Sequence, residues 1–210
     1  MLCRLYNWRS GSNLLSDGLR ITGRAGRPNQ FFLPSFESYF RDRHGLNADI
    51  CFADYVEAII KGSSTSNAVF GFKVMDWYLD DFLARLRQTG AFGRADISDL
   101  ALLRNAFPRL RFIHIVRRHK LRQAISKARA VQTGLWKLQP GKSETAPAEF
   151  DRPLINRRLK EAEEGEGIWS AFFHRVGVEP FRVEYEESAK TTKEQSAAFS
   201  IFSISLFPAG

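Results

Sequence analysis

The sequence lacks several features that mark common classes of protein. The first glycine and the lysine of the nucleotide-hydrolase loop G-x-x-x-x-G-K-S/T are missing around Gly11, so a nucleotide hydrolase is not indicated. The two cysteines, Cys3 and Cys51, fall in apolar runs without metal-ligand spacing, which predicts buried thiols in a reducing compartment and no metal. No stretch has the length and apolar character of a membrane span or a signal peptide. We therefore expect a cytoplasmic protein without stable membrane insertion.

The composition is that of one folded, basic domain. The 210 residues are 44% hydrophobic and include 18 phenylalanines, enough for a single core across residues 1–210. Lysine and arginine number 31 against 23 aspartates and glutamates, a formal net charge of +8. Such a charge favours an anionic partner, whether a nucleotide, a nucleic acid or a membrane surface.

The stretch Arg9-Ser10-Gly11-Ser12-Asn13 lies between a short apolar run and a helix-like run. A strand that passes through a small-residue turn into a helix leaves several backbone N–H groups unpaired, and the helix dipole adds positive potential at that point. With the arginine charge and two hydroxyl donors, this pattern predicts a phosphate or sulfate site. The alternative is an ordinary helix with a serine N-cap.

A second unit of the same kind starts at residue 111. Arg111–Val116 predicts a buried strand, which is followed by a basic turn and a helix beginning near Leu121. Arg118 at the turn and Ser126 in the helix form a candidate pair for a second phosphate. His114, inside the strand, is better explained as a core or network histidine than as a catalyst.

Hydrophobic patterning predicts the other elements. Lys73 would be the one charge in the strand expected at Ala68–Val74. A lysine in a strand more often lies at the edge of the sheet, or extends its ammonium to solvent, than points into an anion site. We expect strands at Leu2–Trp8 and Ala68–Val74, helices at Leu14–Thr22, Asp54–Ile60 and Leu79–Leu86, and a serine-rich loop at Gly62–Asn67.

Four further segments have less specific patterns. Phe31 and Phe32 either line a pocket or belong to the core. Gln139–Ala148 has the composition of a mobile loop over the site, and Leu159–Gly167 carries glutamates typical of a solvated helix face. The apolar tail Phe199–Phe207 has neither helical periodicity nor turn residues, so it either packs against a partner or the core or is prone to aggregation.

Several motifs occur together and in order. The chain resembles the bacterial trehalose 2-sulfotransferase family, and the resemblance covers most of its length. The residues that carry it are Arg9-Ser10-Gly11-Ser12-x-Leu14-Leu15, Gly23-x-Ala25-Gly26-x-Pro28, Phe70-Gly71-x-Lys73, Val116-Arg117-Arg118-x-Lys120-Leu121-Arg122-Gln123-Ala124-x-Ser126, Arg129-Ala130-x-Gln132-Thr133-Gly134-x-Trp136 and Arg182-Val183-x-Tyr185-Glu186.

The resemblance implies a fold, a cosubstrate and a reaction. The fold would be α/β, a P-loop-like three-layer sandwich whose mainly parallel central sheet is flanked by helices. The enzyme would transfer a sulfuryl group from 3′-phosphoadenosine-5′-phosphosulfate (PAPS) to a hydroxyl of a carbohydrate or glycolipid acceptor such as trehalose. Arg9, Ser10, Gly11, Ser12 and Asn13 would hold the 5′-phosphosulfate, with Arg9 also catalytic. Arg118 and Ser126 would hold the 3′-phosphate. Members of the family are dimers, which predicts a homodimer.

The sequence departs from the family at the catalytic base. Gln30 stands where the family has a glutamate, and a primary amide does not accept a proton at physiological pH. Glu37 and His44 are the nearest substitutes in sequence, although spacing gives no reason to place either at the site. The short first strand and the apolar C-terminal segment also differ from the family pattern. They indicate a diverged or fragmentary member of the family.

Three functions therefore compete. The first is an active sulfotransferase, and the second is a pseudoenzyme that binds the nucleotide but lacks the base. The third is a basic nucleic-acid-binding protein, which the cations of residues 117–129 favour but no nucleic-acid motif accompanies. We expect no nucleic-acid partner.

Overall fold

The computed structural model describes residues 1–136 and 147–188. Within these residues the strands β1 (Leu2–Tyr6), β2 (Gly71–Met75), β3 (Arg111–Val116) and β4 (Phe181–Glu184) form one sheet in the order β2-β1-β3-β4. Every neighbouring pair is parallel. The expected α/β fold with a parallel central sheet is confirmed.

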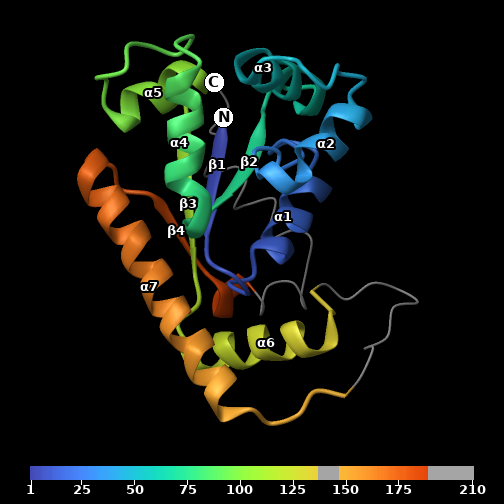
Figure 1. Cartoon of the computed structure of the whole chain (residues 1–210), viewed down its shortest axis with the longest axis vertical. Coiled ribbons are helices and arrows are strands. Elements are labelled where there is room, and N and C mark those ends of the chain that lie inside the picture. The colour runs from blue at the N-terminus through green and yellow to red at the C-terminus, as the bar shows by residue number, and fades with distance from the viewer. Residues whose placement is uncertain (137–146, 189–210) are drawn as a thin grey trace.

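Helices enclose this sheet as the outer layers of a three-layer sandwich. Figure 1 shows α1 and α2 on one side of the sheet, α4 and α7 on the other, and α6 across the edge where the strands end. The helices are α1 (Ser12–Ile21), α2 (Pro34–Arg43), α3 (Phe52–Ser63), α4 (Leu79–Gln88), α5 (Asp99–Ala106), α6 (Lys120–Thr133) and α7 (Arg152–Val176), and a 3-10 turn η1 (Asp76–Tyr78) joins β2 to α4.

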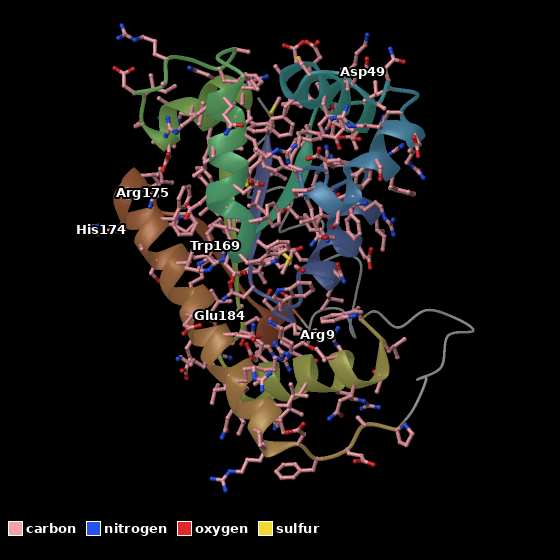
Figure 2. The ribbon with its side chains drawn as sticks, in the orientation of Figure 1. Arg9, Asp49, Trp169, His174, Arg175 and Glu184 are labelled. Carbon is pink, nitrogen blue, oxygen red and sulfur yellow. The ribbon has the colours of Figure 1, made fainter. Side chains whose placement is uncertain are left out.

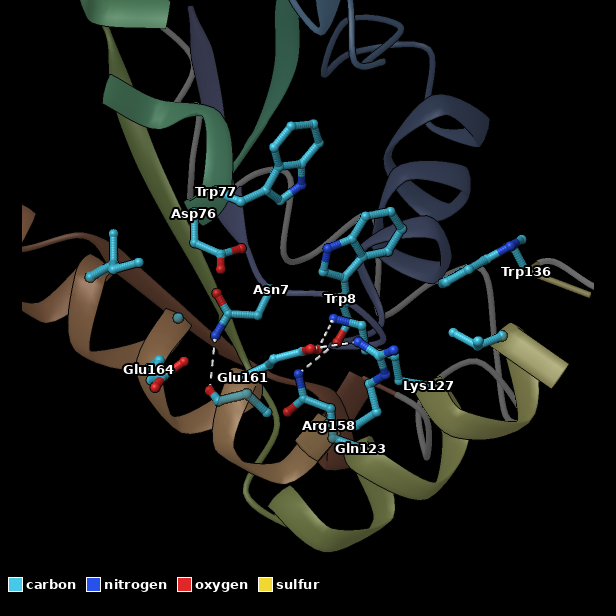
Figure 3. A pocket seen from close by; sticks show the side chains of 14 residues that line it. Asn7, Trp8, Asp76, Trp77, Gln123, Lys127, Trp136, Arg158, Glu161 and Glu164 are labelled. Carbon is cyan, nitrogen blue, oxygen red and sulfur yellow. Dashed lines mark hydrogen bonds and ion pairs between the residues drawn. The ribbon is translucent and has the colours of Figure 1, made fainter. Parts of the chain in front are cut away.

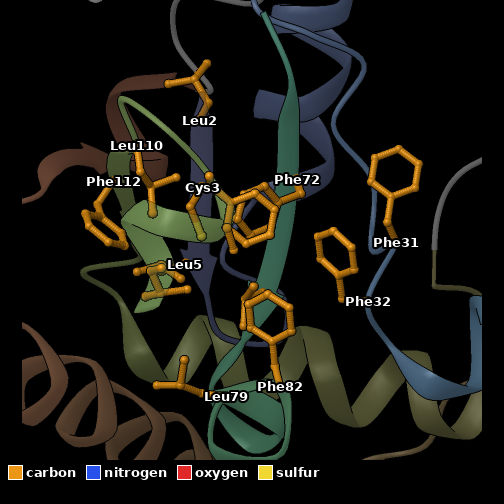
Figure 4. Packing of buried hydrophobic residues seen from close by; sticks show 14 of the residues in the cluster. Leu2, Cys3, Leu5, Phe31, Phe32, Phe72, Leu79, Phe82, Leu110 and Phe112 are labelled. Carbon is orange, nitrogen blue, oxygen red and sulfur yellow. The ribbon is translucent and has the colours of Figure 1, made fainter. Parts of the chain in front are cut away.

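The alternation of side chains in β2 separates a hydrophobic face from a polar one. Phe72 lies on the face covered by α4 and α7, where its ring is 4.4 Å from that of Phe107 and 6.2 Å from that of Phe82 (Figure 4). Lys73, the next residue, therefore points to the face covered by α1. Phe31 and Phe32 are buried in the same aromatic core, which resolves the choice between core and pocket for these two residues.

Some predicted boundaries were wrong. α3 runs from Phe52 to Ser63, so the first two residues of the predicted serine-rich loop, Gly62 and Ser63, belong to the last turn of the helix. The strand predicted at Ala68–Val74 starts at Gly71, since a turn closed by the Ala68 N–H and the Thr65 carbonyl precedes it. Cys3 is buried as expected, but Cys51 is exposed: its Sγ caps α3 by accepting from the Asp54 N–H at 3.4 Å. β3 has the predicted bounds.

The order of the strands determines where a ligand can bind. From β1 the chain moves first to β2 on one side and later to β3 on the other, so the crossover direction reverses between β1 and β3. In open parallel sheets such a reversal opens a crevice at the carboxyl ends of the strands. The two basic segments singled out in the sequence follow β1 and β3, and they therefore meet at this crevice.

Two predicted segments lie outside the described residues. These are most of the loop Gln139–Ala148 and the whole apolar tail Phe199–Phe207.

Candidate active site

The loop after β1 has the geometry of an anion site. The N-cap of α1 is Gly11, with φ +93°, and no side chain caps the helix. The alternative of an ordinary serine-capped helix is therefore not what the structure shows. Ser10 is buried beneath the loop at 1% exposure, and its Oγ has no hydrogen-bond partner. A buried hydroxyl beside an uncapped helix start is costly unless a ligand completes its hydrogen bonds.

A cavity of about 860 Å³ opens in front of this loop. This volume is in the range typical of small-molecule sites. Its lining comes from several parts of the chain. Among its residues are the loop and first turn of α1 (Arg9, Gly11, Ser12, Asn13), Asn29, Gln30 and Phe36, Lys73 and Met75 at the end of β2, Arg117, Ser126 and Tyr185, and the three tryptophans Trp8, Trp77 and Trp136.

Gly11 is required at this position for two reasons. Its positive φ is unfavourable for other residues, and a Cβ there would lie 2.3 Å from Cδ2 of Tyr185. The ring of Tyr185 in turn lies 4.5 Å from the Arg117 guanidinium. The loop therefore packs against Tyr185, which follows β4, and Tyr185 packs against Arg117, which follows β3.

Lys73 lies in β2, the edge strand of the described sheet, and its side chain turns to the cavity instead of solvent. Only 6% of the residue is exposed, and its Nζ is 3.1 Å from Oδ1 of Asn13 at the start of α1. The ammonium also lies 5.6 Å from the centre of the Tyr6 ring. Lys73 therefore brings a buried positive charge to the cavity, opposite Arg9.

Arg9 connects the loop to α6, and Figure 2 places it between the end of the sheet and that helix. Its Nε donates to Ser126 Oγ at 2.9 Å and its Nη1 to the Trp136 carbonyl at 2.5 Å. Arg117 donates to the Arg9 carbonyl at 3.1 Å. Burial, and then the proximity of Arg117, lower the pKa of Arg9, while burial lowers the pKa of Arg117. Two half-buried cations this close favour an anion between them.

A second basic cavity of about 430 Å³ adjoins the first. It shares Arg9, Arg117, Ser126 and Trp136 with the larger cavity and adds two arginines of α6, Arg122 and Arg129. The positions 122, 126 and 129 follow the i, i+4, i+7 spacing of one helix face. Sequence reasoning missed Arg122 and Arg129 as site residues, although this spacing was available to find them.

Arg118 does not face Ser126. Its guanidinium pairs with Glu184 and Glu187, both at 3.1 Å, and half of its side chain is exposed. The backbone N–H groups of Arg118 and His119 donate to the Glu186 carboxylate at 3.1 and 3.2 Å. The N–H groups of the second basic turn are therefore bound to an acid of this chain, and Arg9, instead of the predicted Arg118, lies beside Ser126.

Gln30, the residue predicted at the position of the family's base, is part of the wall of the larger cavity. The adjacent Asn29 forms a single parallel bridge with β2, and the Asn29 carbonyl accepts from the Lys73 N–H at 2.9 Å. The Gln30 amide nitrogen donates to the Tyr6 hydroxyl and contacts Met75 Sδ at 3.3 Å. Tyr6, which also lines this cavity, is a third residue that sequence reasoning missed.

The two suggested substitutes for a base lie elsewhere. Glu37 is paired with Arg85 at 2.5 Å, and His44 is 3.4 Å from the Ser63 hydroxyl. Neither lines the cavity. His114 is a core histidine, as expected: it is buried, its ring is 5.4 Å from that of Phe173, and burial lowers its pKa to about 4.

The glutamate run of α7 is only partly a solvated face. Glu163 and Glu164 are exposed, as expected, but Glu161 and Glu166 turn toward α6. There they pair with Lys127 at 2.7 Å and with Lys120 at 3.0 Å. These pairs hold α6 and α7 together and engage two of the cations that had pointed to nucleic acid.

The comparison with known families decides what kind of site this is. The model of the family described as "Stf0 sulphotransferase" matches residues 4–200. The chain belongs to this family. Sulfuryl transfer is therefore the class of reaction that the site serves.

Two curated relatives carry the same name, "Trehalose 2-sulfotransferase". The protein of Mycolicibacterium smegmatis is 31% identical over 86% of this chain and 75% of its own length. The protein of Mycobacterium tuberculosis is 29% identical, with the same two shares.

Two further observations concern the described residues. None of their helices combines the length and apolar character needed to cross a membrane. Their histidine, cysteine and acidic side chains form no cluster of three or more that could hold a metal ion.

Proposed function

We propose that this protein transfers a sulfuryl group from PAPS to a hydroxyl of a carbohydrate or glycolipid acceptor. The observation that supports this proposal best is the pair of adjoining basic cavities. One lies at the uncapped start of α1 beside Arg9 and Lys73, and the other lies on the α6 face with Arg122 and Arg129. PAPS has two separated anionic groups, so it needs two such sites. The names of the relatives make trehalose the first acceptor to test.

In this proposal the loop from Arg9 to Asn13 holds the 5′-phosphosulfate. The bond between sulfur and the 5′-phosphate oxygen breaks while a bond from the acceptor oxygen to sulfur forms. The acceptor proton passes to water, because the Gln30 amide does not accept it. Charge then grows on the departing phosphate oxygen, where the loop N–H groups, Arg9 and Lys73 stabilise it. No metal is required, because the cations of the chain supply this positive charge.

The 3′-phosphate is assigned to the side of the cavities formed by α6. Ser126, which the sequence predicts as a 3′-phosphate ligand, lines both cavities. Arg117 also lines both, and Arg122 lines the smaller one. Arg118 stays a predicted ligand. Its ion pairs with Glu184 and Glu187 are exposed, and such pairs contribute about 0–1 kcal/mol, so a phosphate would displace them at little cost.

A second function is favoured by one observation, the amide at position 30. A chain with intact anion sites but no carboxylate beside the acceptor would bind the nucleotide and turn over slowly, since general-base catalysis contributes about 10²–10⁴-fold. A nucleic-acid partner is not proposed, because Lys120 and Lys127, two of the cations that favoured it, are half-buried or buried in ion pairs with Glu166 and Glu161 of the same chain.

The test is calorimetric titration with 3′-phosphoadenosine 5′-phosphate, with adenosine 5′-phosphate as the control ligand. We expect tight binding that needs the 3′-phosphate and that falls at least tenfold in Arg122→Ala. The matched variant Arg118→Ala tests, in the same experiment, the prediction from the sequence that Arg118 binds the 3′-phosphate. No binding by a folded wild-type sample would refute the proposal. Equal affinity for the two nucleotides would show that the protein has no site for the 3′-phosphate.

The predicted homodimer and carbohydrate acceptor belong to the same proposal. Sedimentation equilibrium on the sample used for calorimetry measures the oligomeric state, and a monomer at all concentrations would contradict the dimer.

A further inference from the structure

A third cavity, of about 520 Å³, lies on the other side of the loop that follows β1. Its walls are the segments after β1 and β2 and the facing sides of α6 and α7 (Figure 3). Three tryptophans, Trp8, Trp77 and Trp136, line both this cavity and the larger site cavity. The two spaces therefore adjoin, with aromatic side chains between them.

Two buried amides in its lining have fixed orientations. Gln123 is 1% exposed, and its Nε2 donates to the Trp8 carbonyl at 2.7 Å. Asn7 is 3% exposed, and its Nδ2 donates to the Ala162 carbonyl at 3.4 Å. Because each nitrogen is engaged, the remaining atom of each amide is an oxygen, and both oxygens lack a hydrogen-bond partner.

Asp76 adds a third acceptor beside them. Its Oδ1 is buried without a partner, and burial raises the pKa of this carboxyl to about 6. Space for this polar group comes from Gly165 of α7, where a Cβ would lie 2.6 Å from Asp76 Oδ2 and 2.9 Å from Asn7 Oδ1. A glycine in the middle of a helix is less favourable than alanine, and here the missing methyl group leaves room for the two oxygens.

The same lining holds one donor without a partner, Nε of Arg158. Two cations of the lining, Arg158 and Lys127, share the Glu161 carboxylate, at 2.5 and 2.7 Å, and the ionised Asp76 carboxylate supplies the second negative charge. The cavity thus offers three acceptors and one donor in a charge-balanced setting. Buried polar atoms left unpaired are destabilising, so a ligand that both donates and accepts hydrogen bonds is favoured.

Hydroxyl groups do both, and a flat face of C–H groups packs on indole rings. We propose that this cavity binds a neutral polyhydroxylated ring, namely the sugar of the acceptor that does not receive the sulfuryl group. The inference rests on the proposed function in one respect, namely that the other ring of the same acceptor is the one that receives the sulfuryl group. A disaccharide that extends past the shared tryptophans would place one ring here and present the other to the loop after β1.

The experiment measures binding of trehalose by saturation-transfer NMR, with and without 3′-phosphoadenosine 5′-phosphate. Gly165→Ala places a methyl group against Asp76 and Asn7, whereas Gly167→Ala on the same helix meets nothing within 4 Å and is the matched control. We expect at least a tenfold loss of trehalose affinity in Gly165→Ala, with nucleotide affinity unchanged in both variants.

A second variant covers the case in which Gly165→Ala does not fold. Trp77 is 53% exposed, so Trp77→Ala removes one aromatic wall with little effect on the core, and it should also weaken trehalose binding. Equal trehalose affinity in wild type, Gly165→Ala and Trp77→Ala would overturn the inference, as would wild-type protein that binds nucleotide but no trehalose. Failure of nucleotide binding would instead overturn the proposed function, which this design separates from the sugar site.

Discussion

Replacing Gln30 with glutamate should convert a slow site into a fast one. The two side chains have nearly the same shape, so a carboxylate would occupy the place where the Gln30 amide now meets the Tyr6 hydroxyl and Met75. The Tyr6 O–H would then donate to the carboxylate instead of accepting from the amide. Lys73, whose ammonium lies 5.6 Å from the centre of the Tyr6 ring, favours the ionised form.

The expected gain is the usual contribution of a general base. A rise in kcat of about 10²–10⁴-fold corresponds to about 3–5 kcal/mol of transition-state stabilisation. The gain requires an ionised carboxylate, so it should disappear as the pH falls below about 4, the ordinary pKa of glutamate.

The assay is transfer of labelled sulfuryl groups from PAPS to trehalose by wild type and Gln30→Glu. Gln30→Asn is the matched control, because it changes the side chain without adding a base. Nucleotide affinity, measured by calorimetry, should be the same in all three proteins. A change in kcat of less than about threefold in Gln30→Glu, with nucleotide binding intact, would refute the assignment of this position as the proton acceptor.

Three further predictions concern the surroundings of the site. Gly11→Ala should destabilise the protein by about 1–3 kcal/mol and weaken nucleotide binding, because its Cβ would lie 2.3 Å from Tyr185; an unchanged melting temperature and Kd would contradict this. Lys73→Met should weaken nucleotide binding at least tenfold without loss of stability in urea, since it removes a buried charge from the cavity; a lower stability with unchanged affinity would show a structural role instead. Asp76 has a pKa of about 6 in the fold against 3.8 ordinarily, so between these values the unfolded carboxyl ionises first and stability falls as the pH rises. Urea unfolding of Asp76→Asn at about pH 4 and pH 7 should lack this slope, which is at most about 3 kcal/mol and is reduced by partial exposure; identical slopes in both proteins would contradict it.

Local patterns in the sequence were sufficient for the parallel α/β architecture and for the loop that starts α1. Strand β3 has the predicted bounds because its side chains are apolar on both faces and a basic turn ends it. The positions of Arg9–Asn13 and Gln30 also followed from the sequence, since a strand, a turn and a helix start are consecutive in the chain. Boundaries failed where a turn or cap depends on contacts, as at Ser63, Ala68 and Cys51.

Only the tertiary structure decided where the charged side chains point. Whether Lys73 reaches solvent or the cavity depends on Asn13, sixty positions away, and Arg118 pairs with acids that follow β4. Residues 122, 126 and 129 line one cavity with Arg9 and Arg117 only because α6 crosses the edge where the strands end. The cavity beside Gly165 likewise exists only once α7 packs against the segments after β1 and β2. The physical reason is that patterning and propensity act over a few residues, whereas the partner of a buried charge or amide is chosen by the packing of elements that are distant in the chain.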